Sequence, residues 1–103
     1  MNIQTTRNNQ QALVTIKGDI DESGAEEIKR VFREIGASAA QEVTLDFAGV
    51  SHIGSSGIGK LLVFYKDLAI RGGRLSLIHV PPSIALLMRE MKLDTLFGIS
   101  ETK

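Results

Sequence analysis

The segment best suited to chemistry is a loop rich in glycine and serine. It runs from Val50 to Gly59 with the sequence VSHIGSSGIG, between an expected strand and an expected helix. Glycine lets another group approach the backbone closely, and a helix N-terminus offers unpaired N–H groups with about half a unit of positive partial charge. The loop therefore predicts a place for a phosphate, either bound or covalently attached.

A structural role for the same residues is also open. Ser55 or Ser56 could cap the helix while the glycines only shape the turn. Serine is a preferred cap wherever helices start, so the loop taken alone favours this simpler interpretation. The local motif does not decide between the two.

Two nucleotide-binding motifs do not fit this loop. A Walker P-loop needs a hydroxyl after its Gly-Lys pair to hold magnesium, but Gly59-Lys60 is followed by Leu61. A dinucleotide fingerprint has glycines spaced G-x-G-x-x-G, whereas Gly54, Gly57 and Gly59 are spaced G-x-x-G-x-G. Neither kind of nucleotide site is expected here.

Composition narrows the function classes. The chain has 103 residues with 12 basic and 12 acidic side chains, so its formal net charge is zero and no basic field attracts nucleic acid. Cysteine is absent, which excludes disulfides and thiolate metal sites. No apolar run approaches the ~20 residues of a membrane span, and no signal peptide is visible at the start. We expect a cytoplasmic single-domain protein over residues 1–103, with no nucleic-acid partner and no membrane insertion.

The remaining polar residues predict neither metal binding nor catalysis. His52 and His79 lie far apart in sequence, with no thiol or helical i, i+4 partner to complete a metal site. The spacings of serine, histidine and aspartate do not establish the hydrogen-bond relay of a hydrolase. We therefore expect no metal, no cofactor and no enzymatic activity.

The first third of the chain predicts a hairpin followed by a helix. Residues 2–7 and 12–17 alternate between apolar and polar positions around a polar turn, as two short strands do. Ser23 and Glu26 have the spacing of a capping box. A helix should begin there and end near Gly36.

The rest of the chain alternates strands and helices. Strands are expected over residues 42–47 and 74–80, with a short last strand near 96–99. Helices are expected after the glycine-serine loop and again from Pro82. The apolar stripe of the last helix consists of Ile84, Leu87, Met88 and Met91. This order predicts an α/β domain with a mixed sheet of four to five strands, an N-terminal hairpin, and three to four helices mainly on one face.

Four short motifs follow one another along this framework. They are Gly18-Asp19-Ile20-Asp21, Val43-Thr44-Leu45-Asp46-Phe47, Ile53-Gly54-Ser55-Ser56-Gly57-Ile58-Gly59 and Gly72-Gly73-Arg74-Leu75. In this order they resemble the landmarks of STAS domains in bacterial anti-sigma-factor antagonists. The likeness covers residues 3–99, and the first and third motifs are more specific together than either is alone. The chain is therefore expected to be a single STAS domain.

The resemblance implies a phosphorylation site and a partner surface. In that family the serine immediately before the glycine is phosphorylated by a cognate anti-sigma kinase, which corresponds to Ser56, whereas Ser55 matches the position less well. The unphosphorylated form binds the anti-sigma factor, the phosphorylated form does not, and a metal-dependent serine phosphatase resets the cycle. The expected function is thus that of an anti-sigma-factor antagonist controlled at Ser56. The predicted partner-binding residues are Asp21, Gly54, Ser55, Ser56, Gly57 and Ile58.

Two aspartates could support this site. Asp21 matches the family's aspartate before the first helix, so it borders the partner surface or caps the helix. Asp46 could orient the loop around Ser56 by accepting backbone N–H groups, or it could be a solvated strand residue. The sequence leaves both pairs of roles open.

One departure from the family keeps a second function open. The family motif commonly has aspartate two residues before the phosphorylated serine, where this chain has Gly54. The missing carboxylate could remove a kinase contact, or leave an adaptor that is not phosphorylated, such as a subunit of a lipid-transport ABC complex or of another signalling complex. A third hypothesis is a small-anion or nucleotide site without a protein partner. It is disfavoured because Ser56 lacks the nearby basic residue that usually completes such a site.

Overall fold

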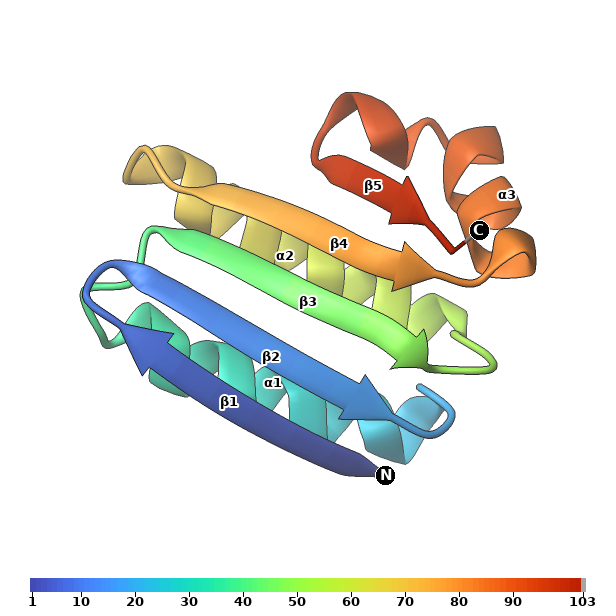
Figure 1. The fold of residues 1–103 in the computed structure, drawn as a ribbon, viewed down its shortest axis with the longest axis horizontal. Coiled ribbons are helices and arrows are strands. Elements are labelled where there is room, and N and C mark those ends of the chain that lie inside the picture. The colour runs from blue at the N-terminus through green and yellow to red at the C-terminus, as the bar shows by residue number, and fades with distance from the viewer. Residues whose placement is uncertain (103) are drawn as a thin grey trace.

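A five-stranded mixed sheet organises the chain (Figure 1). The computed structural model describes residues 1–102, and the strands lie in the order β1-β2-β3-β4-β5. β1 (Asn2–Asn8) pairs antiparallel with β2 (Gln11–Lys17), and β3 (Glu42–Gly49), β4 (Arg74–Val80) and β5 (Gly98–Glu101) extend the sheet in parallel. The predicted hairpin and the predicted mixed α/β sheet are both confirmed.

Three α-helices connect the parallel strands. α1 (Glu22–Gly36) joins β2 to β3, and α2 (Ser55–Ile70) joins β3 to β4. α3 (Pro82–Glu90) and the short 3-10 helix η1 (Leu93–Thr95) lead from β4 to β5. Figure 1 shows α1 and α2 together behind the sheet, which confirms that the helices gather mainly on one face. No helix among residues 1–102 is long and apolar enough to cross a bilayer.

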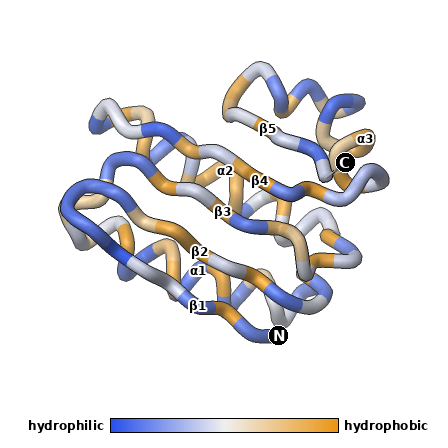
Figure 2. Tube along the Cα trace, in the orientation of Figure 1, coloured by the Kyte–Doolittle hydropathy of each residue, from blue (hydrophilic) through white to orange (hydrophobic). Residues whose placement is uncertain are grey.

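The core lies between the sheet and these two helices. The period-two alternation of the strands puts Val14, Leu45 and Leu77 on the helix side, where each is buried. The intervening Thr44 and Asp46 are only half-buried, because they face the uncovered side of the sheet. Figure 2 shows hydrophobic positions alternating with polar ones along the central strands.

The capping box predicted at Ser23 was wrong, because Asp21, the other cap that the sequence left open, caps α1 two residues earlier. The helix begins at Glu22, and its N-cap is Asp21, whose Oδ1 accepts a hydrogen bond from Gly24 N at 2.8 Å. Ser23 Oγ donates to the same carboxylate oxygen at 3.2 Å, so it supports the cap rather than forming it. Aspartate and serine are both good caps. The bridge of Ile20 to Ile53 holds the chain extended up to Asp21, so the helix begins directly after that residue.

The predicted apolar stripe of α3 is only half right. Ile84 and Met88 are buried, but Leu87 is 37% exposed and Met91, just after the helix, is 47% exposed. Ala85 is buried in their place. α3 has only nine residues and lies near the edge of the sheet, so a single narrow face of it meets the core.

Candidate functional site

The glycine-serine loop leaves the carboxyl end of β3 and enters α2. Ser55 and Ser56 are the first two residues of this helix, and both are exposed. Gly54 is the N-cap, and because it has no side chain it cannot accept a hydrogen bond from the first N–H groups. The helix start therefore presents backbone donors and partial positive charge beside two hydroxyl groups.

A second loop, between β2 and α1, holds the glycine-serine loop in place. Ile20 N donates to His52 O at 2.8 Å, and Gly54 N donates to Ile20 O at 2.9 Å. Ile20 and Ile53 thus form an isolated parallel bridge beyond the ends of their strands. This bridge puts the starts of α1 and α2 beside each other, at the carboxyl edge of the parallel strands where binding sites are favoured.

Gly57 and Ile58 are buried beneath the exposed serines. A Cβ on Gly57 would lie 2.5 Å from Ile20 Cγ2, so only glycine lets α2 approach the first loop this closely. Ile58 is 5% exposed and belongs to the hydrophobic core. These two members of the predicted partner surface shape the site from below, and their side-chain positions offer little to a partner.

Three side chains of the predicted partner surface reach solvent: Asp21, Ser55 and Ser56. Asp21 also caps α1, which confirms one of its two predicted roles. Its hydrogen bond from Gly24 N, assisted by the hydroxyl of Ser23, lowers the pKa of its carboxyl from its usual value. A negative charge therefore lies at the start of α1, beside the start of α2, whose first turn has no acidic residue.

Gly54 has room for a side chain. The nearest atom to a Cβ built there is the carbonyl oxygen of Ile20 at 3.7 Å, an ordinary contact. Its φ of −93° and ψ of 176° are extended values that any residue adopts. Packing therefore does not require glycine in place of the aspartate that the family motif commonly carries.

Asp46 does not orient the loop around Ser56, and that hypothesis was wrong. Its Oδ1 accepts a hydrogen bond from Ala48 N at 3.0 Å and lies 3.1 Å from His79 Nδ1. The alternation of β3 points Asp46 toward the uncovered face, whereas α2 lies on the other face. Within residues 1–102, no three side chains of the metal-binding types gather into a site.

Comparison with known proteins settles the family. The chain matches the STAS domain profile over residues 2–103. It belongs to the STAS domain family.

Three solved structures share the fold of this STAS domain. A putative anti-sigma factor antagonist from Thermotoga maritima superposes with a TM-score of 0.88 at 18% identity, covering 97% of this chain and 86% of that one. The anti-sigma factor antagonist SpoIIAA in its unphosphorylated form gives 0.83 at 20% identity, covering 95% and 87%. The Bacillus cell fate determinant SpoIIAA in its phosphorylated form gives 0.78 at 19%, covering 95% and 90%.

Sequence reasoning missed two polar features of this STAS domain. Lys60 lies four residues after Ser56 on α2, so the expectation that Ser56 has no nearby basic residue was wrong at the distance of one helical turn. Helical spacing alone could have found it. Ser51 Oγ donates a hydrogen bond to Asp19, which ties the two loops together a second time. That contact joins residues 32 apart, and no local pattern in the sequence signals it.

Proposed function

We propose that this STAS domain is an anti-sigma-factor antagonist that changes partners through Ser56. Unphosphorylated, it binds an anti-sigma factor that is also a serine kinase; phosphorylation at Ser56 releases it, and a serine phosphatase restores the first state. The observation that carries the proposal is the exposed Ser56 hydroxyl at a helix start whose first N–H groups have no side-chain cap from Gly54. The fold shared with SpoIIAA supports it. In this role the chain acts in the cytoplasm and has no catalytic activity of its own.

A phosphate on Ser56 would be tolerated by the domain and rejected by the partner. Phosphoserine adds roughly −1.5 to −2 charge at neutral pH. The start of α2 favours negative charge, and Lys60 lies one turn away. A partner surface complementary to a hydroxyl meets an unmatched charge, and a loss of ~3 kcal/mol lowers affinity by a factor on the order of 100. The switch then needs no large conformational change.

The first test is phosphorylation itself. The protein is incubated with ATP, Mg²⁺ and candidate anti-sigma kinases from its own cells, and then analysed by intact mass and peptide mapping. We expect one phosphate on Ser56, which is absent from Ser56→Ala and retained in Ser55→Ala. A wild-type protein that stays unmodified, with a kinase that is active on another substrate, would contradict the proposal.

The second test is the affinity of the two forms for the kinase. Calorimetry should show binding of the unphosphorylated protein and roughly 100-fold weaker binding of the phosphorylated one. Ser55→Ala is the matched control, because Ser55 is also exposed and lies on the same helical turn. Equal affinities for both forms would exclude release by phosphorylation.

A constitutive STAS adaptor is the second candidate, and Gly54 favours it. The position leaves room for an aspartate that is absent, so nothing in the packing explains the loss of a carboxylate beside the phosphorylation site. In this alternative the same exposed edge binds a subunit of a lipid-transport ABC complex or of another signalling complex permanently. Affinity capture from native cells during growth and stress distinguishes the two. A stable transporter subunit with unmodified Ser56 supports the adaptor, whereas recovery of a kinase alone counts against it.

A further inference from the structure

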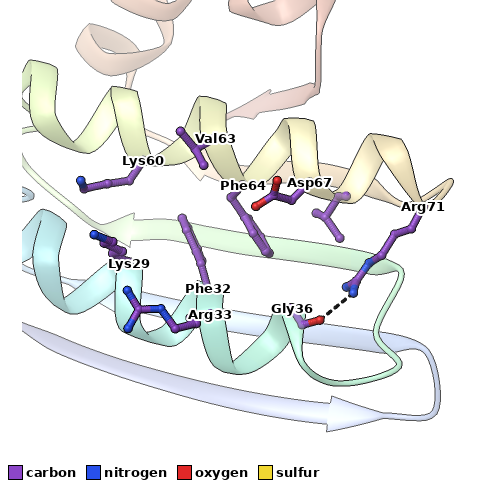
Figure 3. Close-up of a pocket in the computed structure, with 10 residues that line it drawn as sticks. Lys29, Phe32, Arg33, Gly36, Lys60, Val63, Phe64, Asp67 and Arg71 are labelled. Carbon is purple, nitrogen blue, oxygen red and sulfur yellow. Dashed lines mark hydrogen bonds between the residues drawn. The ribbon is translucent and has the colours of Figure 1, made fainter.

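A groove runs between α1 and α2 on the side of the helices away from the sheet (Figure 3). Its volume is about 620 Å³, within the roughly 300–1,000 Å³ range of small-molecule sites. The rings of Phe32 and Phe64 stack across its floor, with centroids 4.0 Å apart and planes 8° from parallel. Val63 forms part of the wall and is 59% exposed, so an apolar side chain is open to solvent there.

The two ends of the groove differ in character. Lys29 and Arg33 of α1 and Lys60 of α2 direct their charged groups toward one end (Figure 3). Among residues 1–102, no carboxylate lies within ion-pair distance of these three cations. At the other end Arg71 donates to Gly36 O at 2.8 Å and to Ala40 O at 2.6 Å, so its guanidinium group is engaged in joining the helices.

The charges of the groove are unbalanced in a chain whose formal net charge is zero. Four cationic side chains line it against a single carboxylate, that of Asp67, which lies between the aromatic floor and Arg71 (Figure 3). An anion is therefore favoured at the end with the three free cations and disfavoured near Asp67. Between the two ends the surface is apolar.

We propose that this groove binds a single-chain amphiphile with an anionic head. The head lies among Lys29, Arg33 and Lys60, and the hydrocarbon chain lies over Phe32, Phe64 and Val63. Size favours such a ligand over a protein, because the groove extends only about 10 Å along α1, from residue 29 to 36, and about 16 Å along α2, from residue 60 to 71. A stable protein interface buries roughly 800 Å² on each partner, which is far more surface than a groove of these dimensions offers. The inference shares Lys60 with the proposed function but no other residue, and it does not depend on phosphorylation of Ser56.

The test is an NMR titration of the ¹⁵N-labelled protein with sodium decanoate below its micelle concentration. We expect amide shifts confined to residues 29–36 and 60–71. Affinity should rise about three-fold or more for each pair of methylenes from butyrate to decanoate, since each one buried adds to the transfer free energy. Decanol and decyltrimethylammonium should bind at least about 10-fold more weakly. Decyl phosphate is run in parallel, and the tighter of the two anions identifies the head group.

Variants separate the groove from general charge effects. Lys29→Glu/Lys60→Glu should weaken decanoate binding at least about 10-fold, whereas Lys66→Glu, an exposed lysine of α2 outside the groove, should change it less than about two-fold. Val63→Glu should also abolish binding while leaving the fold intact, because Val63 is exposed.

Four results would overturn the proposal. They are no shifts at millimolar decanoate, an affinity independent of chain length, an equal loss in the Lys66→Glu control, and preferential binding to phosphatidylglycerol vesicles or to an acidic peptide that displaces decanoate.

Discussion

At the scale of single residues, Gly57 sets how closely α2 approaches the loop before α1. Replacing a helical glycine with alanine normally stabilises a helix by about 1 kcal/mol. At Gly57 the new Cβ would overlap Ile20 Cγ2 at 2.5 Å and touch Ile53 at 3.0 Å, and such overpacking costs roughly 1–3 kcal/mol. Because the overpacking offsets or exceeds the gain in helix propensity, we expect Gly57→Ala to lower the free energy of unfolding by up to about 2 kcal/mol in urea denaturation.

Gly59 is the matched control for that measurement. It lies two residues further along α2, is exposed, and has no atom within 4 Å of a Cβ built on it. Gly59→Ala should therefore raise the free energy of unfolding by about 0.5–1 kcal/mol. If both variants were stabilised alike, Gly57 would not be fixing the distance to Ile20.

A side chain added at Gly54 should stabilise the protein, in contrast to one added at Gly57. Gly54→Asp places a carboxylate at the vacant N-cap of α2, where it can accept hydrogen bonds from the first N–H groups. We expect a gain of a few tenths of a kcal/mol in the free energy of unfolding, because glycine is itself an acceptable cap. Denaturation at pH 7 measures it, with Gly54→Asn as the uncharged control. A loss of stability would mean that the position is more crowded than the 3.7 Å contact indicates.

Asp21 predicts how stability depends on pH. Hydrogen bonds from Gly24 N and from the hydroxyl of Ser23 lower the pKa of this carboxyl in the folded protein. Its contribution is therefore complete above the unfolded pKa of about 3.9 and is lost as pH falls through the lower folded value. Asp21→Asn keeps a cap but removes the titration. Urea denaturation should show the wild type as the more stable protein at pH 7, with the difference shrinking below about pH 4. A difference that stays constant with pH would assign the effect to something other than the charge.

At the scale of helices and strands, sequence patterns predicted the boundaries that local backbone chemistry sets. The hairpin, the end of α1 at Gly36 and the start of α3 at Pro82 were all predicted, because alternation, glycine and proline act locally. The exact start of α1 was missed, since Asp21 and Ser23 are both competent caps and only the position of the preceding loop selects one. Met91 was misplaced because a periodic pattern does not show where a short helix stops touching the core.

The first turns of α2 predict the acidity of a phosphate on Ser56. Lys60 is four residues further on, and a charge pair at this spacing is worth about 0.3–0.5 kcal/mol. It should favour the doubly charged phosphate, so Lys60→Gln should raise the second pKa of phosphoserine by about 0.2–0.4 unit. A ³¹P NMR titration measures this, with Lys66→Gln as the control on the same helix. Equal pKa values in the wild type and Lys60→Gln would show that the phosphate does not interact with Lys60.

At the scale of the whole molecule, the sites arise from the crossovers of the sheet. The loop before Ser56 lies beside the loop before α1 because parallel strands bring their carboxyl ends to one edge, and this much follows from the strand order. The groove between α1 and α2 could not be predicted in the same way. It depends on Phe32 stacking on Phe64 across two helices, and each of those residues alone belongs to an ordinary apolar stripe.

The same architecture predicts that the proposed switch at Ser56 is local. The exposed serine lies above buried Gly57 and Ile58, and two backbone hydrogen bonds join its loop to Ile20. A new charge on the serine should therefore not shift the backbone of the loop. Ser56→Glu should change the free energy of unfolding by less than about 0.5 kcal/mol, because the substitution is exposed and the helix start favours an acid. Backbone NMR shifts should change only near residues 18–22 and 51–60. Shifts that spread to β4 or β5 would mean that a conformational change, and not the charge at the interface, controls the partner.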